Sequence, residues 1–290
     1  MERLRSLRDR TLGEPAPVVA VVRLSGMIGA AGRLRPGGLS LAVLAGPLER
    51  AFKLPRLRAV ALAVNSPGGS AVQSALIGQR IRSLADEHGV PVVAFVEDAA
   101  ASGGYWLACA ADEIFAQEAS IVGSIGVVAA GFGFTGLLGR LGVERRLHTA
   151  GDRKAQLDPF RPEDPEEVAR LKTLLDEIHA SFIAMVRERR GSRLRASEGE
   201  LFNGEFWSGR RALELGLIDG IGEVRGVMRA RYGDKVKLRA VGVQPPLMRR
   251  LLRRSAAPMA ASWPAAFAAG LAEELAARIE ERALWSRYGL

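Results

Sequence analysis

Two glycine-rich turns carry the residues best suited to chemistry. Residues 65–69 read Asn-Ser-Pro-Gly-Gly, and residues 101–105 read Ala-Ser-Gly-Gly-Tyr. Each turn follows an apolar run typical of a buried strand (residues 59–64 and 90–96) and precedes a helical pattern. Glycines at such a point let backbone N–H groups approach a ligand closely, and the start of a helix favours negative charge. We therefore expect Ser102 to be a nucleophile beside an oxyanion hole.

A serine nucleophile needs a base, and the sequence offers histidine or lysine. His88 and His179 are expected on the surface, because the first ends a helix and the second lies on the polar side of a long helix. His148 falls in a strand-like stretch and stays the weaker alternative. Lys154 is the better candidate, although a solvated loop lysine is the competing interpretation. A lysine acts as a base only where burial or a nearby positive charge lowers its pKa, so its assembled site would have to be apolar.

The elements that must position these residues alternate between strands and helices, which predicts an α/β fold with a parallel sheet and crossover connections. Apolar patterning predicts strands at residues 18–24, 59–64, 90–96 and 113–116, with further short strands near residue 127 and at 144–148. Helices are expected at residues 39–52, 70–87 and 102–111, and a turn at residues 120–126.

The second half of the chain predicts a long helix and then a smaller α/β unit. The long helix covers residues 162–190, and the smaller unit has helices at 208–215 and 224–232 and a strand at 236–241. The predicted organisation has three parts: an N-terminal arm (1–16), a main domain (17–244) and an amphipathic helical tail (245–290). The main domain consists of a core at 17–160 and of a helical extension with a small α/β unit at 161–244.

The tail follows the Pro245-Pro246 boundary and carries apolar side chains at helical intervals. These are Trp263, Phe267, Leu271, Leu275 and Ile279. A helix that packs on its own body or on a sister subunit is the leading interpretation. Contact with a membrane surface is the second and disorder the third.

Composition limits the classes of protein that fit. The chain has 290 residues, 48% hydrophobic and 25% charged, as expected for a soluble α/β enzyme. Its single cysteine, Cys109, excludes an internal disulfide and is expected to be buried and inert. The net charge of +9 favours an anionic membrane surface over nucleic acid, for which no recognition motif is present. No transmembrane or signal segment is apparent, so we expect a cytoplasmic or peripherally membrane-associated protein.

Four ordered motifs carry a family resemblance. Residues 65–69 and 100–105 are followed by Gly-Ser-Ile-Gly-Val at 123–127 and by Gly-Asp-Arg-Lys at 151–154. From about residue 18 to 241, this order and spacing resembles the signal peptide peptidase family of serine proteases, which belongs to the Clp protease/crotonase fold.

The resemblance implies a Ser–Lys dyad that needs no metal or cofactor. Ser102 matches the nucleophile, Lys154 the general base and Ser124 a serine that helps to orient the lysine. The dyad would form an acyl-enzyme that water hydrolyses. Oxyanion-hole backbone is implied at three glycines, Gly68, Gly69 and Gly103, with the first and last as the expected amide donors.

The same resemblance implies partners. The chain holds one copy of the motif set, like the short form that must form homo-oligomers, and we expect it not to carry the N-terminal anchor of many bacterial members. Peptide or protein substrates are expected, including signal-peptide or membrane-derived fragments with small or apolar residues at the cleavage point. Two other classes stay open. A crotonase-like enzyme acting on coenzyme A thioesters would explain Gly68 and Gly103 but not Ser102 with Lys154, and a scaffold could keep the motifs without activity.

Overall fold

The computed structural model describes residues 15–29 and 38–242, and in the tail residues 282, 283, 285, 286 and 288. The predicted apolar stripe of the tail and almost all of the predicted N-terminal arm lie outside the described residues.

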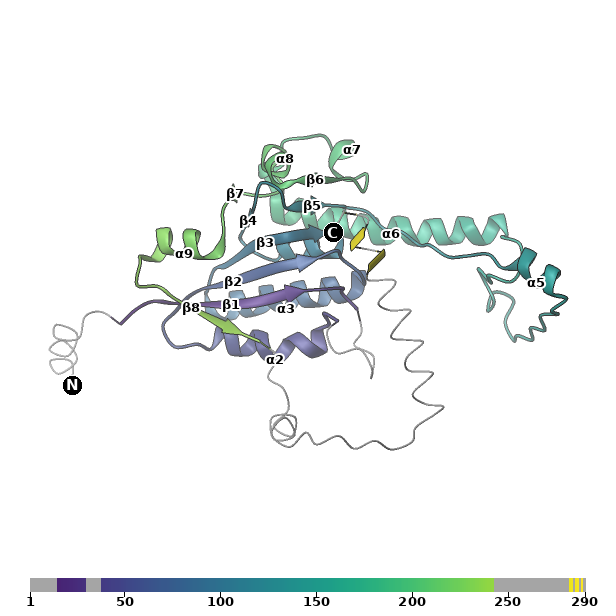
Figure 1. The fold of residues 1–290 in the computed structure, drawn as a ribbon, viewed down its shortest axis with the longest axis horizontal. Helices are drawn as coiled ribbons and strands as arrows, with labels where there is room; N and C mark the ends of the chain where they lie inside the picture. Colours follow the sequence, from purple (N-terminus) through teal and green to yellow (C-terminus); the bar gives the residue numbers. More distant parts are fainter. Residues whose placement is uncertain (1–14, 30–37, 243–281, 284, 287, 289–290) are drawn as a thin grey trace, which may run out of the picture.

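One sheet organises the chain (Figure 1). Its strands are β1 (Val18–Ser25), β2 (Leu57–Ser66), β3 (Val92–Ala101), β4 (Glu113–Ala116), β5 (Ile121–Gly123), β6 (Phe206–Ser208), β7 (Gly220–Ile221) and β8 (Lys237–Val241). The order is β6-β5-β3-β2-β1-β8, with β4 between β3 and β7. All pairs are parallel except β5 with β6. The predicted α/β class with a mostly parallel sheet is confirmed.

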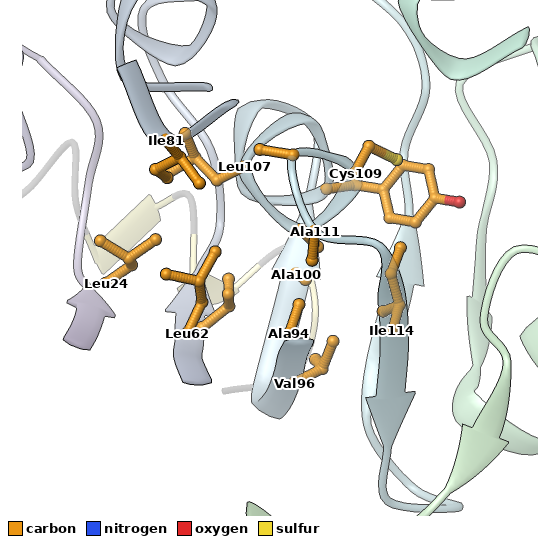
Figure 2. Close-up of a cluster of buried hydrophobic side chains, with 14 of the residues drawn as sticks. Leu24, Leu62, Ile81, Ala94, Val96, Ala100, Leu107, Cys109, Ala111 and Ile114 are labelled. Carbon is orange, nitrogen blue, oxygen red and sulfur yellow. The ribbon is translucent and has the colours of Figure 1, made fainter. Parts of the chain in front are cut away.

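The strands bury both faces because their side chains alternate. On β1, Ala20, Val22 and Leu24 join the larger core cluster and Val19 joins a smaller one on the other side. Figure 2 shows the larger cluster, in which Leu24 and Leu62 of neighbouring strands lie near Ile81 and Leu107.

Helices cover the two faces unequally. The larger cluster is covered by α2 (Leu41–Phe52), α3 (Ala71–His88), α4 (Gly103–Cys109) and α6 (Pro165–Arg190). The smaller cluster is closed by Met228 of α9 (Val224–Tyr232). The remaining helical segments are short: α5 (Thr135–Leu141), the 3-10 turn η1 (Gly191–Arg193), α7 (Glu198–Leu201) and α8 (Gly209–Glu214).

The predicted small unit is part of the same sheet, since β6, β7 and β8 each pair with a strand from the first half of the chain. Arg190, at the end of α6, is 2% exposed and anchors this junction. Its guanidinium lies 2.7 Å from Asp219 and donates to the Gly216 carbonyl at 2.8 Å. A buried charge is stable only when it is paired and hydrogen-bonded in this way.

Three local predictions are wrong. The expected turn at 120–126 contains β5, which forms because it pairs with β3 and β6. No strand forms near residue 127 or at 144–148, where the side chains are largely exposed and have no neighbouring strand. Instead residues 128–161, which we call the arm, include α5 and extend beyond the start of α6 (Figure 1). Among the described residues, no helix is both long and apolar enough to cross a bilayer.

Candidate active site

Ser102 lies at a sharp turn between β3 and α4. Its φ is 52°, a conformation that non-glycine residues rarely adopt. Its N–H donates to the Gly123 carbonyl at 2.8 Å, and its own carbonyl accepts from Tyr105 and Trp106 at 2.9 and 3.1 Å. Such strain costs of order 1–3 kcal/mol and persists where the surrounding structure imposes it, which is common at active sites. The half-buried Ser102 lines a cavity.

The cavity has a volume of about 870 Å³, within the range of ligand sites. Around Ser102 it is lined by the small residues Gly69, Gly103 and Ser124. Much of the remaining lining is apolar and largely aromatic: Trp106, Leu175, Ile178, Phe182, Phe202 and Phe206. No aspartate, glutamate, lysine or arginine is among the described residues that line it. The site is therefore suited to apolar side chains.

The glycines differ in how their amides are used. Gly68 donates its N–H to Ser66 Oγ at 3.2 Å. The amides of Gly69 and Gly103 have no acceptor within the described part of the chain. These two residues are close together, since a Cβ built on Gly103 would lie 3.5 Å from the Gly69 nitrogen. The geometry therefore favours Gly69 with Gly103 as the amide pair, rather than the expected pair of Gly68 with Gly103.

Gly68 lies directly against Ser102, with no room for a side chain. Its φ is +107°, and an added Cβ would lie 2.8 Å from the Cβ of Ser102 and 3.0 Å from the Ala101 carbonyl. We expect Gly68→Ala to lower kcat/KM by about 100-fold, because a nucleophile displaced by about 1 Å loses that much. The backbone strain should also lower the free energy of unfolding by about 1–3 kcal/mol.

Gly89 provides the matched control for this substitution. It also has positive φ (+60°), but nothing lies within 4 Å of an added Cβ, at the far end of α3. Gly89→Ala should lower stability by about 1–2 kcal/mol and leave kcat/KM unchanged. Steady-state kinetics measure the loss of activity in the two variants, and thermal melts measure the loss of stability. Equal losses of activity in the two variants would refute the steric role of Gly68.

Ser124 shares the cavity with Ser102 and also has a φ of 52°. Its N–H donates to the Glu205 carbonyl at 2.7 Å, which holds the turn against the loop before β6. Tyr288 of the tail reaches the same place. Its hydroxyl lies 3.4 Å from Ser124 Oγ, and its ring meets the ring of Phe206 edge-on at 5.0 Å. Nothing in the sequence pattern indicated Tyr288, because its contact is with residues more than 80 positions away.

One further side chain was misplaced by the sequence. His179 was expected on the surface, but it lines the cavity and its Nε2 is 3.0 Å from the Ile125 carbonyl. Trp106 stacks on Phe182 at 4.7 Å and also lines the cavity. Its neighbour Tyr105 is fully buried and donates to the Leu217 carbonyl at 2.7 Å.

Cys109 is buried, as predicted. Burial raises the pKa of its thiol to about 11, so the reactive thiolate is scarce at neutral pH.

Lys154 is not in the cavity. It lies exposed in a turn of the arm, and it is absent from the described residues that line the cavity beside Ser102. His148, the alternative base, is also exposed in the arm. One copy of the chain in this conformation therefore unites Ser102 with the candidate amides but leaves the site without its expected base.

Comparison with known proteins identifies the family. The model of peptidase family S49 matches residues 85–237, more than half of the chain and including Ser102, Ser124 and Lys154. The chain belongs to peptidase family S49. This membership confirms the resemblance inferred from the four motifs.

Curated relatives of this chain are longer proteins, of which it covers only part. A Brucella abortus protein named Na(+)/H(+) antiporter NhaA is 52% identical over 99% of this chain, which covers 39% of that protein. The Arabidopsis thaliana serine protease SPPA, chloroplastic, is 32% identical over 60% of this chain and 25% of its own length. Protease 4 of Haemophilus influenzae is 32% identical over 70% of this chain and 32% of its own length. The chain thus spans less than two fifths of each of these relatives.

Proposed function

We propose that this S49 chain is a serine endopeptidase in which Ser102 is the nucleophile. The observation that carries the proposal is the strained turn that presents Ser102 to an apolar cavity beside two amides without acceptors among the described residues. Family membership supports the reaction class. Neither thioester chemistry nor a scaffold role accounts for this placement of the serine.

The proposed reaction proceeds through an acyl-enzyme. The Lys154 amine accepts the Ser102 hydroxyl proton as Oγ attacks the carbonyl carbon of the scissile peptide bond. The N–H groups of Gly69 and Gly103 stabilise the oxyanion of the tetrahedral intermediate. The lysine returns its proton to the leaving amine, and water then hydrolyses the ester. Ser124 lines the same cavity, and we assign it the role of orienting the lysine there.

Assembly of the site requires Lys154 to reach the cavity, and a second copy of the chain is the proposed source. The arm that carries Lys154 exposes many large apolar side chains: Val128, Phe132, Leu137, Leu141, Val143 and Leu147. Exposed apolar surface of this kind marks association surfaces. We place the chain in a homo-oligomer whose neighbouring copies bury the arm.

Substrate preference follows from the cavity wall. An aromatic and aliphatic lining without a charged residue makes burial of a charged side chain expensive. We expect cleavage after leucine, phenylalanine or similar residues to exceed cleavage after aspartate or lysine by at least about 100-fold, since 1.4 kcal/mol corresponds to about tenfold.

A peptide-library cleavage profile measures this preference, with Ser102→Ala as the background. Equal cleavage after aspartate, lysine and leucine by the wild-type protein would contradict the proposed binding site, and no cleavage above the background would contradict the proposed function.

Peripheral contact with a membrane completes the proposal. The net charge of +9 favours anionic lipid, and the Brucella abortus relative that contains a matching region carries the name of an antiporter.

A further inference from the structure

Glu167 is a charged side chain in an unusual place. It is 9% exposed, in the first turn of α6, three residues after the N-cap residue Asp164. A glutamate at this position commonly reaches back to the N-cap amide. Here both carboxylate oxygens accept hydrogen bonds from the end of the arm. Oε2 accepts from the Leu157 N–H at 2.8 Å, and Oε1 accepts from the Arg161 guanidinium.

Further hydrogen bonds hold the residues on both sides of Lys154, and one of them comes from the same Arg161. Arg161 also donates to the Ala155 carbonyl at 2.9 Å. The Gln156 side chain donates to the Arg153 carbonyl at 3.0 Å. The residues immediately before and after Lys154 are therefore held through their carbonyl groups.

A second connection ties the same loop to α6. Arg170, one turn after Glu167, donates from Nε to Gln156 Oε1 at 2.9 Å. All partners in these bonds lie between residues 153 and 170. The network is therefore confined to this loop and the start of α6, and it includes no residue of the cavity.

The loop also contains a residue in a strained backbone conformation. Leu157 has a φ of +54°, which is rare for a branched side chain and costs about 1–2 kcal/mol. The Leu157 N–H donates the hydrogen bond that Glu167 Oε2 accepts. This bond, followed by that from Arg161, holds the pKa of Glu167 below its ordinary value. The carboxylate is consequently ionised throughout the neutral range, where the network is complete.

We propose that Glu167, together with Arg161, is a positioning residue for Lys154. By fixing the backbone of the loop, it sets the direction in which the Lys154 side chain projects, so that the amine meets Ser102 when the site assembles. This inference rests on the proposed function, because it assumes that Lys154 is the base.

The test compares variants of the full chain in steady-state peptide hydrolysis. Glu167→Ala removes both bonds and should lower kcat by about 100-fold, because misplacing a reacting group by about 1 Å costs that much. KM should stay within about threefold, since Glu167 does not line the cavity. Glu167→Gln keeps an acceptor for the Leu157 N–H and should retain several-fold more activity than the alanine variant.

The matched control is Glu177→Ala, which removes an exposed glutamate from the same helix and should leave kcat unchanged. Lys154→Ala distinguishes a failure of the proposed dyad from a failure of the positioning role. If Lys154→Ala is inactive while Glu167→Ala keeps more than a third of wild-type kcat, the positioning role is wrong and the dyad stands. A rise in KM with unchanged kcat in Glu167→Ala would also overturn it. An active Lys154→Ala would overturn the dyad and the positioning role with it.

Discussion

Replacing Ser102 with alanine is expected to lower peptide hydrolysis by at least about 1,000-fold, because it removes the atom that forms the acyl-enzyme. The fold should be unaffected. The backbone of Ser102 makes the turn through its N–H to Gly123 and its carbonyl to α4, and alanine keeps both groups.

Thermal melts and hydrolysis of a leucine-containing peptide measure the two effects. Because the φ of 52° is unfavourable for alanine as well as serine, the melting temperature should change little. Retention of more than about a tenth of wild-type turnover would be incompatible with covalent catalysis by this serine.

The second large effect is expected at Lys154. Lys154→Ala should lower turnover by at least about 1,000-fold, because Ser102 would lose the group that takes its proton. Lys154→Arg should fail as well, since a guanidinium keeps its proton at any working pH. Lys154 is exposed, so neither change should affect stability. An active arginine variant would remove Lys154 from the mechanism and return attention to His148.

Mixing two inactive variants tests where the lysine comes from. If Lys154 serves the Ser102 of a neighbouring copy, co-assembled Ser102→Ala and Lys154→Ala chains should recover about a quarter of the wild-type sites by random pairing. No recovery from chains shown to co-assemble would mean that the arm supplies Lys154 within one copy.

The turn at Ser102 was predictable because its signals are local. An apolar strand, a serine and two glycines before a helix predict the turn at Ser102, and the long helix and α9 follow from the spacing of their apolar residues. β5 was missed because three residues carry no strand pattern of their own. It exists through pairing with β3 and β6, which the sequence does not specify at short range.

The rest of the site depends on contacts between distant segments. Periodicity places His179 on one side of α6 but does not show that the Ile125 carbonyl meets it there. The resemblance implies Lys154 as the base, yet its position relative to Ser102 depends on the arm and on what the arm contacts. Only the structure shows that the Glu167 carboxylate accepts hydrogen bonds from Leu157 and Arg161, in the loop that carries Lys154.

The most direct test of the central claim is covalent labelling with a fluorophosphonate, followed by mass spectrometry to locate the adduct. A serine activated by a base and an oxyanion hole reacts with this reagent, whereas an ordinary serine hydroxyl does not. We predict one adduct per reactive chain, located on Ser102 and absent from Ser102→Ala. No adduct on the wild-type protein, or equal labelling of Ser102→Ala, would contradict the assignment of Ser102 as an activated nucleophile.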